Sequence, residues 1–366
     1  MARTRIISNN KAVFATSTGW GGGDTDPQQL HRIDTFSFEV DQAAAREDIR
    51  EFGQLARIAT ELTSEITPTL SIGYYLGDGE NETYLGLTPS ALDAQIISGI
   101  LTEDPVVRQR NLYVTTVKEG EDAFNSATWD TLEADQDTIG FGNVTLTTYT
   151  VNFAVGEIPR VDVEAEASNI VFYTGHTALP NPSVDDFYNR QGGTVTMATA
   201  PSTGDMPFAV LRPQDVTVSF QNDQISAGDN IGVTLSDICV QSASIEVPLA
   251  RENVECLGKE RGTKYLEFPI SVSLSLNALV SDFKEGSLEY VLTGTAGDDR
   301  TDIVVQVDDK LGSPVHYFKL ANAVLDSQSF STTLDDNETV DLTFSAQIAG
   351  ASTTDEGVFW SGAGVI

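Results

Sequence analysis

The chain repeats itself, and this repeat constrains its fold more than any other feature of the sequence. Three segments of the first half return in the second half in the same order, with their apolar positions in register. The matched segments are residues 45–53 with 250–258, residues 110–117 with 300–307, and the runs that begin at Asn143 and Asn322, separated by 205, 190 and 179 residues. Because both the order and the apolar pattern are kept, we interpret the chain as a tandem duplication of one domain.

The first matched pair contains the residues that define the repeat motif. In each copy an arginine and a glutamate are adjacent, and a glycine stands six residues after the glutamate. The motif residues are Arg46, Glu47 and Gly53 in the first copy, and Arg251, Glu252 and Gly258 in the second. The small and charged residues before the first glycine predict a short helix over residues 45–52 that stops at Gly53.

The spacing between matched segments falls along the chain, so the first copy is longer than the second by 26 residues. Part of this surplus contains Ser90, a good N-cap residue for a helix. The apolar residues that would share one face of that helix are Leu92, Ile96, Ile97, Ile100 and Leu101. We therefore expect a helical insertion over about residues 88–103 without a counterpart in the second copy. A third short helix is predicted over residues 183–188.

Elsewhere, apolar residues alternate with polar ones, which is the pattern of strands with one buried face. Residues 36–40, 151–155 and 268–276 all show this alternation. Long helical patterns are scarce. The sequence therefore predicts a mainly β fold with a few short helices.

The two copies are separated by residues 174–209, which are rich in Pro, Gly, Ser and Thr and predict a linker with loops. The expected organisation is an N-terminal arm (residues 1–27), a first domain (28–173), this linker, a second domain (210–350) and a C-terminal tail (351–366).

The charge of the chain excludes several partners. Its 366 residues include 21 Lys and Arg against 54 Asp and Glu, a formal net charge of −33. Such a chain repels phosphate, so we expect it neither to read or coat nucleic acid nor to bind an anionic membrane surface. Few lysines with many carboxylates are also typical of proteins that work in concentrated salt, where repulsion is screened. We expect a salt-loving host, with an acidic mesophilic protein as the alternative.

The sequence predicts neither membrane insertion nor secretion through a signal peptide. No apolar run approaches the roughly 20 residues of a transmembrane helix, and the N-terminus lacks the apolar stretch of a signal. Cys239 and Cys256 are too few for a disulfide framework and stand outside any metal-binding pattern. We therefore expect reduced thiols in a protein made in the host cytoplasm.

Residues that could perform catalysis do not converge in this sequence. His31, His176 and His316 stand in unrelated contexts, and the common nucleophile, metalloprotease and nucleotide-binding motifs are missing. Among 54 carboxylates, a pair at glycosidase spacing could arise by chance. We expect no catalytic residues, no cofactor and no enzymatic activity.

Two acidic clusters have the oxygen ligands that calcium prefers. One contains Asp78, Glu80 and Glu82, and the other contains Asp335 and Asp336. Neither fits the EF-hand loop, and each stands between expected strands, where Asp, Asn and Gly supply turn geometry. We interpret both clusters as turns, with a calcium site as the alternative.

Together, these segments resemble the major tail tube proteins of tailed viruses, whether bacteriophages or viruses of salt-loving archaea. The likeness is carried by residues 32–38, 46–53, 73–87 and 155–159 in the first copy, and by residues 241–258 and 268–270 in the second. It spans about residues 28–170 and 210–350.

The resemblance implies two tandem tail-tube-type domains, each a β-sandwich or barrel, whose sheet continues into neighbouring subunits and closes a ring. Rings of this family normally contain six domains, so two domains per chain imply a homotrimer with pseudo-sixfold symmetry. Stacked rings in the virion tail would conduct DNA during ejection, with tape-measure, terminator and baseplate or tip proteins as further partners. Residues 83–108 and the N-terminal arm are the expected contacts between stacked rings.

Two other functions stay open at this point. The chain could have another structural role in a virion, as a terminator, sheath or decoration protein. It could also be an acidic extracellular adhesin that binds glycan or calcium, although the missing signal sequence counts against this role.

Overall fold

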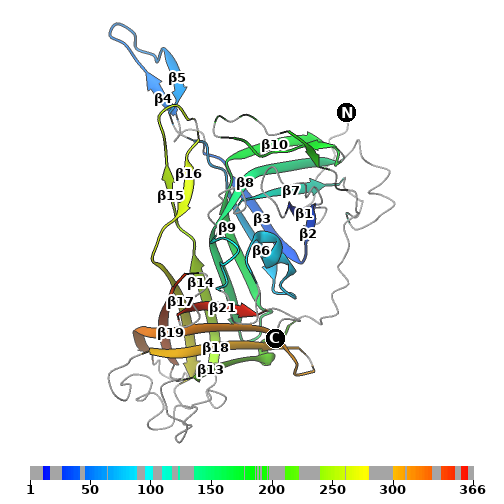
Figure 1. Ribbon diagram of the computed structural model, residues 1–366, viewed down its shortest axis with the longest axis vertical. Helices are drawn as coiled ribbons and strands as arrows, with labels where there is room; N and C mark the ends of the chain where they lie inside the picture. Colours follow the sequence, from blue (N-terminus) through cyan, green and yellow to red (C-terminus); the bar gives the residue numbers. More distant parts are fainter. Residues whose placement is uncertain are drawn as a thin grey trace, which may run out of the picture.

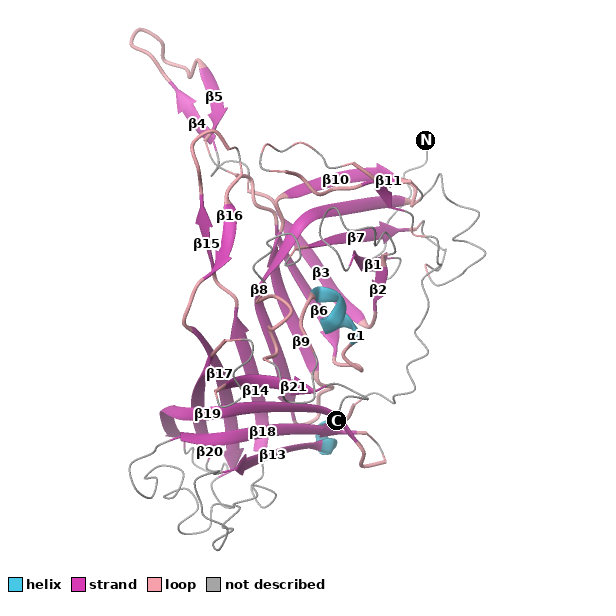
Figure 2. Ribbon diagram, in the orientation of Figure 1, coloured by secondary structure: helices cyan, strands magenta, loops and turns pink. Residues whose placement is uncertain are grey.

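The structure of the chain is a computed structural model. Its described residues are 11–16, 27–41, 46–63, 65–88, 95–101, 109–117, 123, 136–176, 178–185, 187, 189, 192–195, 197, 211–221, 240–259, 261–279, 300–309, 311–331, 339–350 and 356–361. Within these residues the fold is mainly β, with large antiparallel sheets and a single α-helix (Figures 1 and 2). The predicted fold class is therefore confirmed.

The elements of the first half are β1 (Lys11–Thr16), β2 (Gln28–Leu30), β3 (Ile33–Glu39), β4 (Arg46–Ile49), β5 (Ala59–Leu62), β6 (Thr69–Tyr75), α1 (Glu80–Leu85), β7 (Arg110–Thr116), β8 (Asp137–Ala154), β9 (Arg160–Glu166) and β10 (Asn169–Thr174). The short elements β11 (Leu179–Pro180), β12 (Thr194–Val195) and the 3-10 turn η3 (Pro213–Asp215) follow. The second half contains β13 (Val216–Gln221), β14 (Val240–Pro248), β15 (Arg251–Val254), β16 (Thr263–Leu266), β17 (Ile270–Leu279), β18 (Arg300–Asp308), β19 (Pro314–Ser331), β20 (Thr339–Ile348) and β21 (Gly357–Ser361).

The described strands of the two halves pair in the same way. β7 lies between β1 and β8, as β18 lies between β13 and β19. β9 joins β8 to β6, which pairs with β3; likewise β20 joins β19 to β17, which pairs with β14. β10 adds to β8 as β21 adds to β19, and the hairpins β4–β5 and β15–β16 follow β3 and β14. The halves therefore share one strand topology.

One backbone irregularity is also repeated. Asn143 in β8 and Asn322 in β19 have φ angles of 55° and 56°, a left-handed conformation that asparagine adopts more readily than most residues. The side-chain oxygen of Asn111 accepts a hydrogen bond from the backbone N–H of Asn143 (3.1 Å), and Asp302 does the same for Asn322 (2.9 Å). In each half, a side chain of the neighbouring strand thus stabilises the bulge by accepting a hydrogen bond from the backbone.

The strand register shows that our alignment of residues 110–117 with 300–307 is displaced by one residue. Arg110 lies opposite Val144, and Thr301 lies opposite Ala323. Val144 and Ala323 are equivalent because β8 and β19 align throughout at the separation of 179 residues. Arg110 therefore corresponds to Thr301, one residue beyond the expected Arg300.

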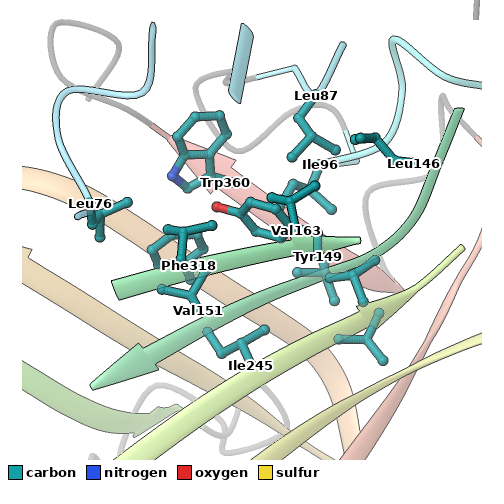
Figure 3. Packing of buried hydrophobic residues seen from close by; sticks show 14 of the residues in the cluster. Leu76, Leu87, Ile96, Leu146, Tyr149, Val151, Val163, Ile245, Phe318 and Trp360 are labelled. Carbon is teal, nitrogen blue, oxygen red and sulfur yellow. The ribbon is translucent and has the colours of Figure 1, made fainter. Parts of the chain in front are cut away.

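A continuous sheet runs through both halves in the order β3–β6–β9–β8–β14–β17–β20–β19. Its apolar face packs into a core that contains residues of both halves. Tyr149 and Val163 of the first half lie in this core with Phe318 and Trp360 of the second, and all four are fully buried (Figure 3). The two halves are therefore stabilised by one shared apolar cluster.

The predicted helix over residues 45–52 is wrong. Arg46–Ile49 forms β4, which pairs with β5 in a hairpin, and the equivalent residues of the second half form the hairpin β15–β16. Asp48 accepts hydrogen bonds from both Arg57 (2.9 Å) and Thr60 (3.1 Å) across the hairpin. Helix propensity differs among these residues by only tenths of a kcal/mol, so cross-strand pairing can override it.

The helical insertion expected over residues 88–103 is also wrong for its described part. Residues 95–101 form turns and an isolated bridge, and the backbone N–H of Ile96 donates to the carbonyl of Val358 (2.8 Å). This segment of the first half therefore extends the edge of β21 in the second half.

One further predicted helix is missing, and one helix is present where we expected a turn. The described residues of 183–188 are not helical, and the backbone N–H of Val184 donates instead to the side chain of Asn143 (2.8 Å). Conversely, α1 begins within the acidic cluster that we interpreted as a turn. Gly79 and Gly86, with φ angles of 93° and 99°, bound this helix on either side.

Three segments that we placed outside the domains contain strands. β1 lies in the expected arm, β11 and β12 lie in the expected linker, and β21 lies in the expected tail. β1 pairs with β7, β21 pairs with β19, and most side chains of both strands are buried. The sheet-forming halves therefore extend beyond the expected limits, to Lys11 and Ser361.

Candidate functional site: an assembly interface

The two halves meet in a strand-to-strand joint between β8 and β14 (Figure 1). Ile245 lies opposite Val151, and both side chains are fully buried. On the other face, the Ser244 hydroxyl donates to Asn152 Oδ1 over 2.7 Å. The joint is therefore an ordinary antiparallel pairing, with an apolar face toward the core and a polar face away from it.

The hairpin β15–β16 adds polar contacts beside this joint. Arg251 Nε donates to the carbonyl oxygen of Leu146 (3.3 Å), next to a bulge between β8 and β9. Lys264 Nζ lies 2.6 Å from Glu166 Oε2, and the Lys264 side chain is only 8% exposed. Both strands of the hairpin thus contact the first half.

A third contact involves Arg261, which precedes β16 and is largely buried. Its Nε donates to the Ser168 hydroxyl (3.0 Å), and a terminal nitrogen donates to the carbonyl of Val184 (3.3 Å). The carboxylate of Glu65, also buried, lies 3.7 Å from the same Nε. Burial of this charge is offset by these oxygen partners from the first half.

Each half also contains the counterpart of a strand that forms this joint, and the edges of these counterparts are unpaired among the described strands. β3 corresponds to β14, and residues 327–331 of β19 correspond to the part of β8 in the joint, yet no described strand pairs with these outer edges. Phe38, the equivalent of Ile245, is 39% exposed, whereas Ile245 is 0% exposed. Unpaired edges of this length are templates for another strand.

The hairpin β4–β5 projects away from the body of the molecule (Figure 1). Phe52 and Leu55 at its tip are fully exposed, and Ile49 and Ile58 are about half exposed. Leu257 is fully exposed at the tip of β15–β16. A two-stranded hairpin that exposes large apolar side chains is marginally stable in water and is typical of a contact surface.

The motif residues lie in these two hairpins. Gly53 and Gly258 have φ angles of 98° and 86° and occupy the third position of equivalent β-turns, which favours glycine. The turns are closed by hydrogen bonds from Gln54 N–H to Glu51 O (3.4 Å) and from Lys259 N–H to Cys256 O (3.1 Å). Arg46, Glu47 and Glu252 are exposed, whereas Arg251 is half buried against the first half.

The second face of the continuous sheet is mostly polar, and its apolar side chains lie at strand ends, at Tyr75, Ala154, Pro248 and Leu279. We call it the polar face. Its described polar residues are Thr35, Ser37, Glu39, Thr69, Ser71, Gly73, Arg160, Asp162, Glu164, Glu166, Thr148, Thr150, Asn152, Ser242, Ser244, Glu246, Ser271, Ser273, Ser275, Asn277, Thr339, Asp341, Thr343, Ser345, Gln347, Ser327 and Ser329. Arg160, its one cation, is paired with Asp34 (2.6 Å) and Asp162 (3.0 Å). The polar face therefore presents hydroxyl groups and a net negative charge.

The first acidic cluster does not converge on a common point. Glu82 is buried in the core and accepts hydrogen bonds from the hydroxyls of Tyr74 (2.9 Å) and Tyr149 (3.4 Å). Burial raises the pKa of Glu82 to about 7. Asp78 instead accepts a hydrogen bond from the backbone N–H of Glu80 (3.2 Å) at the start of α1. Asp335 and Asp336 lie outside the described residues.

Two of the histidines, His176 and His316, are buried, at 3% and 0% exposure. His316 is fully buried, with its ring 6.1 Å from that of Phe318 and 5.9 Å from that of Trp360, and burial lowers its pKa to about 4. Its Nε2 lies 2.5 Å from the carbonyl oxygen of Gly77. Across the described ranges, no group of three or more His, Cys, Asp or Glu residues could hold a metal ion. Nor does any helix there have the length and apolar character needed to cross a membrane.

No family model and no curated protein matches this chain. Among solved structures, it is similar to a chain of the anti-feeding prophage baseplate, with 14% identity, a TM-score of 0.29, and coverage of 40% of this chain and 92% of that one. It is also similar to the SPP1 tail tube (12% identity, TM-score 0.29, 42% and 79% covered) and to the tail of an empty GTA particle (13%, 0.24, 38% and 96%). TM-scores this low do not decide a function.

Proposed function

We propose that the chain is a structural subunit of a viral tail tube, and that its halves arose by duplication of one tube-type domain. The observation that best supports this proposal is the joint between β8 and β14, because the equivalent strands β19 and β3 each have an edge with which no described strand pairs. A second copy of the chain could complete the same joint, with its β3 added to β19. Such a head-to-tail contact closes a ring when its rotation allows closure.

Equivalence of the two joints specifies the register between chains. Phe38 of one chain would lie opposite Phe330 of the next, as Ile245 lies opposite Val151. Glu39 would then lie opposite Ser329. Addition of the neighbour would also cover Phe38, whose exposure is unfavourable at about 25 cal/mol per Å² of apolar surface. Three chains, each with two domains, would make the ring of six domains that the family resemblance implies.

In this ring the polar face would line the lumen. Its hydroxyl and carboxylate groups offer little attraction to phosphate, and three chains of net charge −33 carry −99 per ring. DNA could therefore pass during ejection with little adhesion. Rings would stack in the virion tail, where tape-measure, terminator and baseplate or tip proteins would be the other partners. Synthesis in the host cytoplasm completes the proposed localisation.

Contacts between stacked rings are proposed to involve the exposed hairpin tips. Phe52, Leu55 and Leu257 present apolar surface there. The described part of the expected contact segment 83–108 favours a different role, because Ile96, Ile97 and Ile100 are buried within the chain. We therefore place the contacts between rings at the hairpin tips in preference to residues 95–101.

Electron microscopy of the purified chain at high salt tests the proposal most directly. We expect threefold rings that stack into tubes, whereas persistent monomers at high concentration would contradict it. Single rings that never stack would favour the terminator role instead.

A disulfide pair tests the joint itself. With Cys239 and Cys256 replaced by serine, Glu39→Cys and Ser329→Cys should link neighbouring chains into covalent rings, because opposed strand residues have the Cα separation that a disulfide needs. The matched control combines Glu39→Cys with Gln328→Cys, since a shift of one residue places the two side chains on opposite faces. Equal cross-linking of both pairs would exclude the proposed register.

A further inference from the structure

We propose that the hairpin β4–β5 holds the neighbouring chain through two arginines. Arg46 would donate to the carbonyl of Leu325, and Arg57 would pair with the carboxylate of Glu356. This inference rests on the proposed ring and names the side chains that secure each joint between chains.

The two arginines have counterparts whose contacts are made within the chain. Arg46 begins β4 as Arg251 begins β15, and Arg57 precedes β5 by two residues as Arg261 precedes β16. Arg251 and Arg261 both bind oxygens of the first half beside the joint. Arg46 and Arg57 lie on the exposed hairpin β4–β5, where Arg57 pairs with Asp48 (2.9 Å).

The acceptors on the second half are equivalent to those on the first. Leu325 lies next to the bulge between β19 and β20, as Leu146 lies next to the bulge between β8 and β9. Glu356 immediately precedes β21, as Ser168 immediately precedes β10. Placement of the hairpin on a neighbour in the same way would bring Arg46 to a carbonyl and Arg57 to a carboxylate. Arg57 would thus meet a carboxylate at the position where Arg261 donates to the Ser168 hydroxyl, whereas the carboxylate beside Arg261 is that of Glu65.

Charge complementarity supports the second pair. Arg57 is bound to Asp48 (2.9 Å) on its hairpin, and Glu356 is bound to Arg300 (2.9 Å) on the second half. Docking would place the side chains of Asp48, Arg57, Glu356 and Arg300 in a row in which negative and positive charges alternate. Exposed ion pairs contribute little when isolated, but a network of several charges contributes more.

The third hairpin contact distinguishes the joint within the chain from the joint between chains. Thr60 and Ser345 stand where Lys264 and Glu166 form their ion pair. The joint between chains would therefore contain the ion pair of Arg57 with Glu356, whereas the joint within the chain contains those of Lys264 with Glu166 and Arg261 with Glu65. Each hairpin would then match its own acceptor surface better than that of the other half.

A double-mutant cycle on ring formation tests this inference. The chain concentration at half assembly would be measured by sedimentation for Arg57→Gln, Glu356→Gln and the double variant. Each single change should raise that concentration about three- to fivefold, and the double variant should raise it no further. Arg46→Gln should raise it as well. Arg50→Gln is the matched control, because Arg50 is an exposed arginine of the same hairpin whose equivalent in the second hairpin is Glu255 and not an arginine.

The outcomes separate this inference from the proposed ring. If rings form and Arg57→Gln assembles like the unmodified chain, or if the two single effects add, the arginine contacts are excluded while the ring stands. If the unmodified chain stays monomeric, the ring itself is excluded. All these side chains are exposed, so unchanged thermal unfolding of the monomer should accompany each variant.

Discussion

The carboxyl group of Glu82 accepts a hydrogen bond from the Tyr74 hydroxyl over 2.9 Å inside an apolar core. Glu82 is 1% exposed, and Tyr149 donates a second, longer hydrogen bond to the same oxygen. Two neutral donors do not fully replace water around a carboxylate, so burial favours the protonated acid. Its pKa rises from 4.5 to about 7.

Stability should therefore depend on pH through Glu82. The folded-state pKa is raised, so the contribution is fully present below pH 4.5 and is lost as pH rises through about 7. At 1.36 kcal/mol per pKa unit, Glu82 should cost about 3 kcal/mol of unfolding free energy at pH 8 relative to pH 4. Urea unfolding of Glu82→Gln at both pH values should remove this part of the dependence, whereas Glu80→Gln should keep it. An identical pH profile for Glu82→Gln would contradict the assignment.

Gln95 should stabilise the contact between the first half and β21. Its amide nitrogen donates to the carbonyl of Glu356 (2.6 Å), and its oxygen accepts from the backbone N–H of Val358 (2.9 Å), with no exposure to solvent. Gln95→Ala should lower the unfolding free energy by about 1–3 kcal/mol, because a buried N–H loses its acceptor. Hydrogen exchange should accelerate at Val358. The control Ser98→Ala should leave that amide protected, and protection that survives in Gln95→Ala would refute the role.

The left-handed bulge predicts an unusual ranking of substitutions at Asn322. Its φ of 56° disfavours alanine, so Asn322→Ala should cost about 1 kcal/mol more than Asn322→Gly. Asn143→Gly should be costly despite the same geometry, because the Asn143 side chain also binds Val184 (2.8 Å) and Gln109 (2.7 Å). Thermal unfolding of these variants gives the ranking. Alanine tolerated as well as glycine at Asn322 would contradict it.

The ion pair of the joint within the chain should be transferable to the joint between chains. Thr60→Lys combined with Ser345→Glu reproduces Lys264 and Glu166 at the equivalent positions. The double variant should lower the concentration needed for ring assembly about threefold, a gain typical of a partly exposed pair. Ser345→Glu alone should not strengthen assembly. No difference between the single and double variants in sedimentation would exclude equivalence of the two joints.

Tube length should depend on ionic strength. A ring of charge −99 repels its neighbours, and the screening length grows from about 3 Å at 1 M salt to about 10 Å at 0.1 M. Dialysis from molar salt to 0.1 M should therefore shorten or dissolve the tubes, as measured by electron microscopy. Sucrose at matched osmolarity serves as the control without charge. Tubes of constant length across this range would remove the electrostatic argument.

Local alternation allowed the strands to be predicted, whereas the hairpins were missed. Residues 268–276 alternate apolar and polar side chains, and β17 spans Ile270–Leu279. Residues 45–52 contain helix-forming residues, but their partner strand at Ala59–Leu62 decides their conformation. The helix stop predicted at Gly53 is wrong, because Gly53 has a φ of 98° within the β-turn of the hairpin.

The interface could be predicted only in outline, because strand pairing between distant segments has no local signature. Ile245 and Val151 are separated by 94 residues, and nothing in either strand indicates the other as its partner. Phe38 has the same alternating context as Ile245, yet one is partly exposed at an edge and the other is buried. The acidic cluster was misread for a related reason, since the burial of Glu82 depends on Tyr74 and Tyr149 from two other strands.

The joint between β8 and β14 has a thermodynamic consequence for the proposed ring. A ring of six separate domains would need six joints made by collision, and its equilibrium yield would rise with the sixth power of subunit concentration. When three of those joints form during folding of the chain, the yield rises only with the third power, and the translational entropy of two associations is lost in place of five. Fusion of two domains would thus let rings form at low chain concentration, early in the accumulation of the protein.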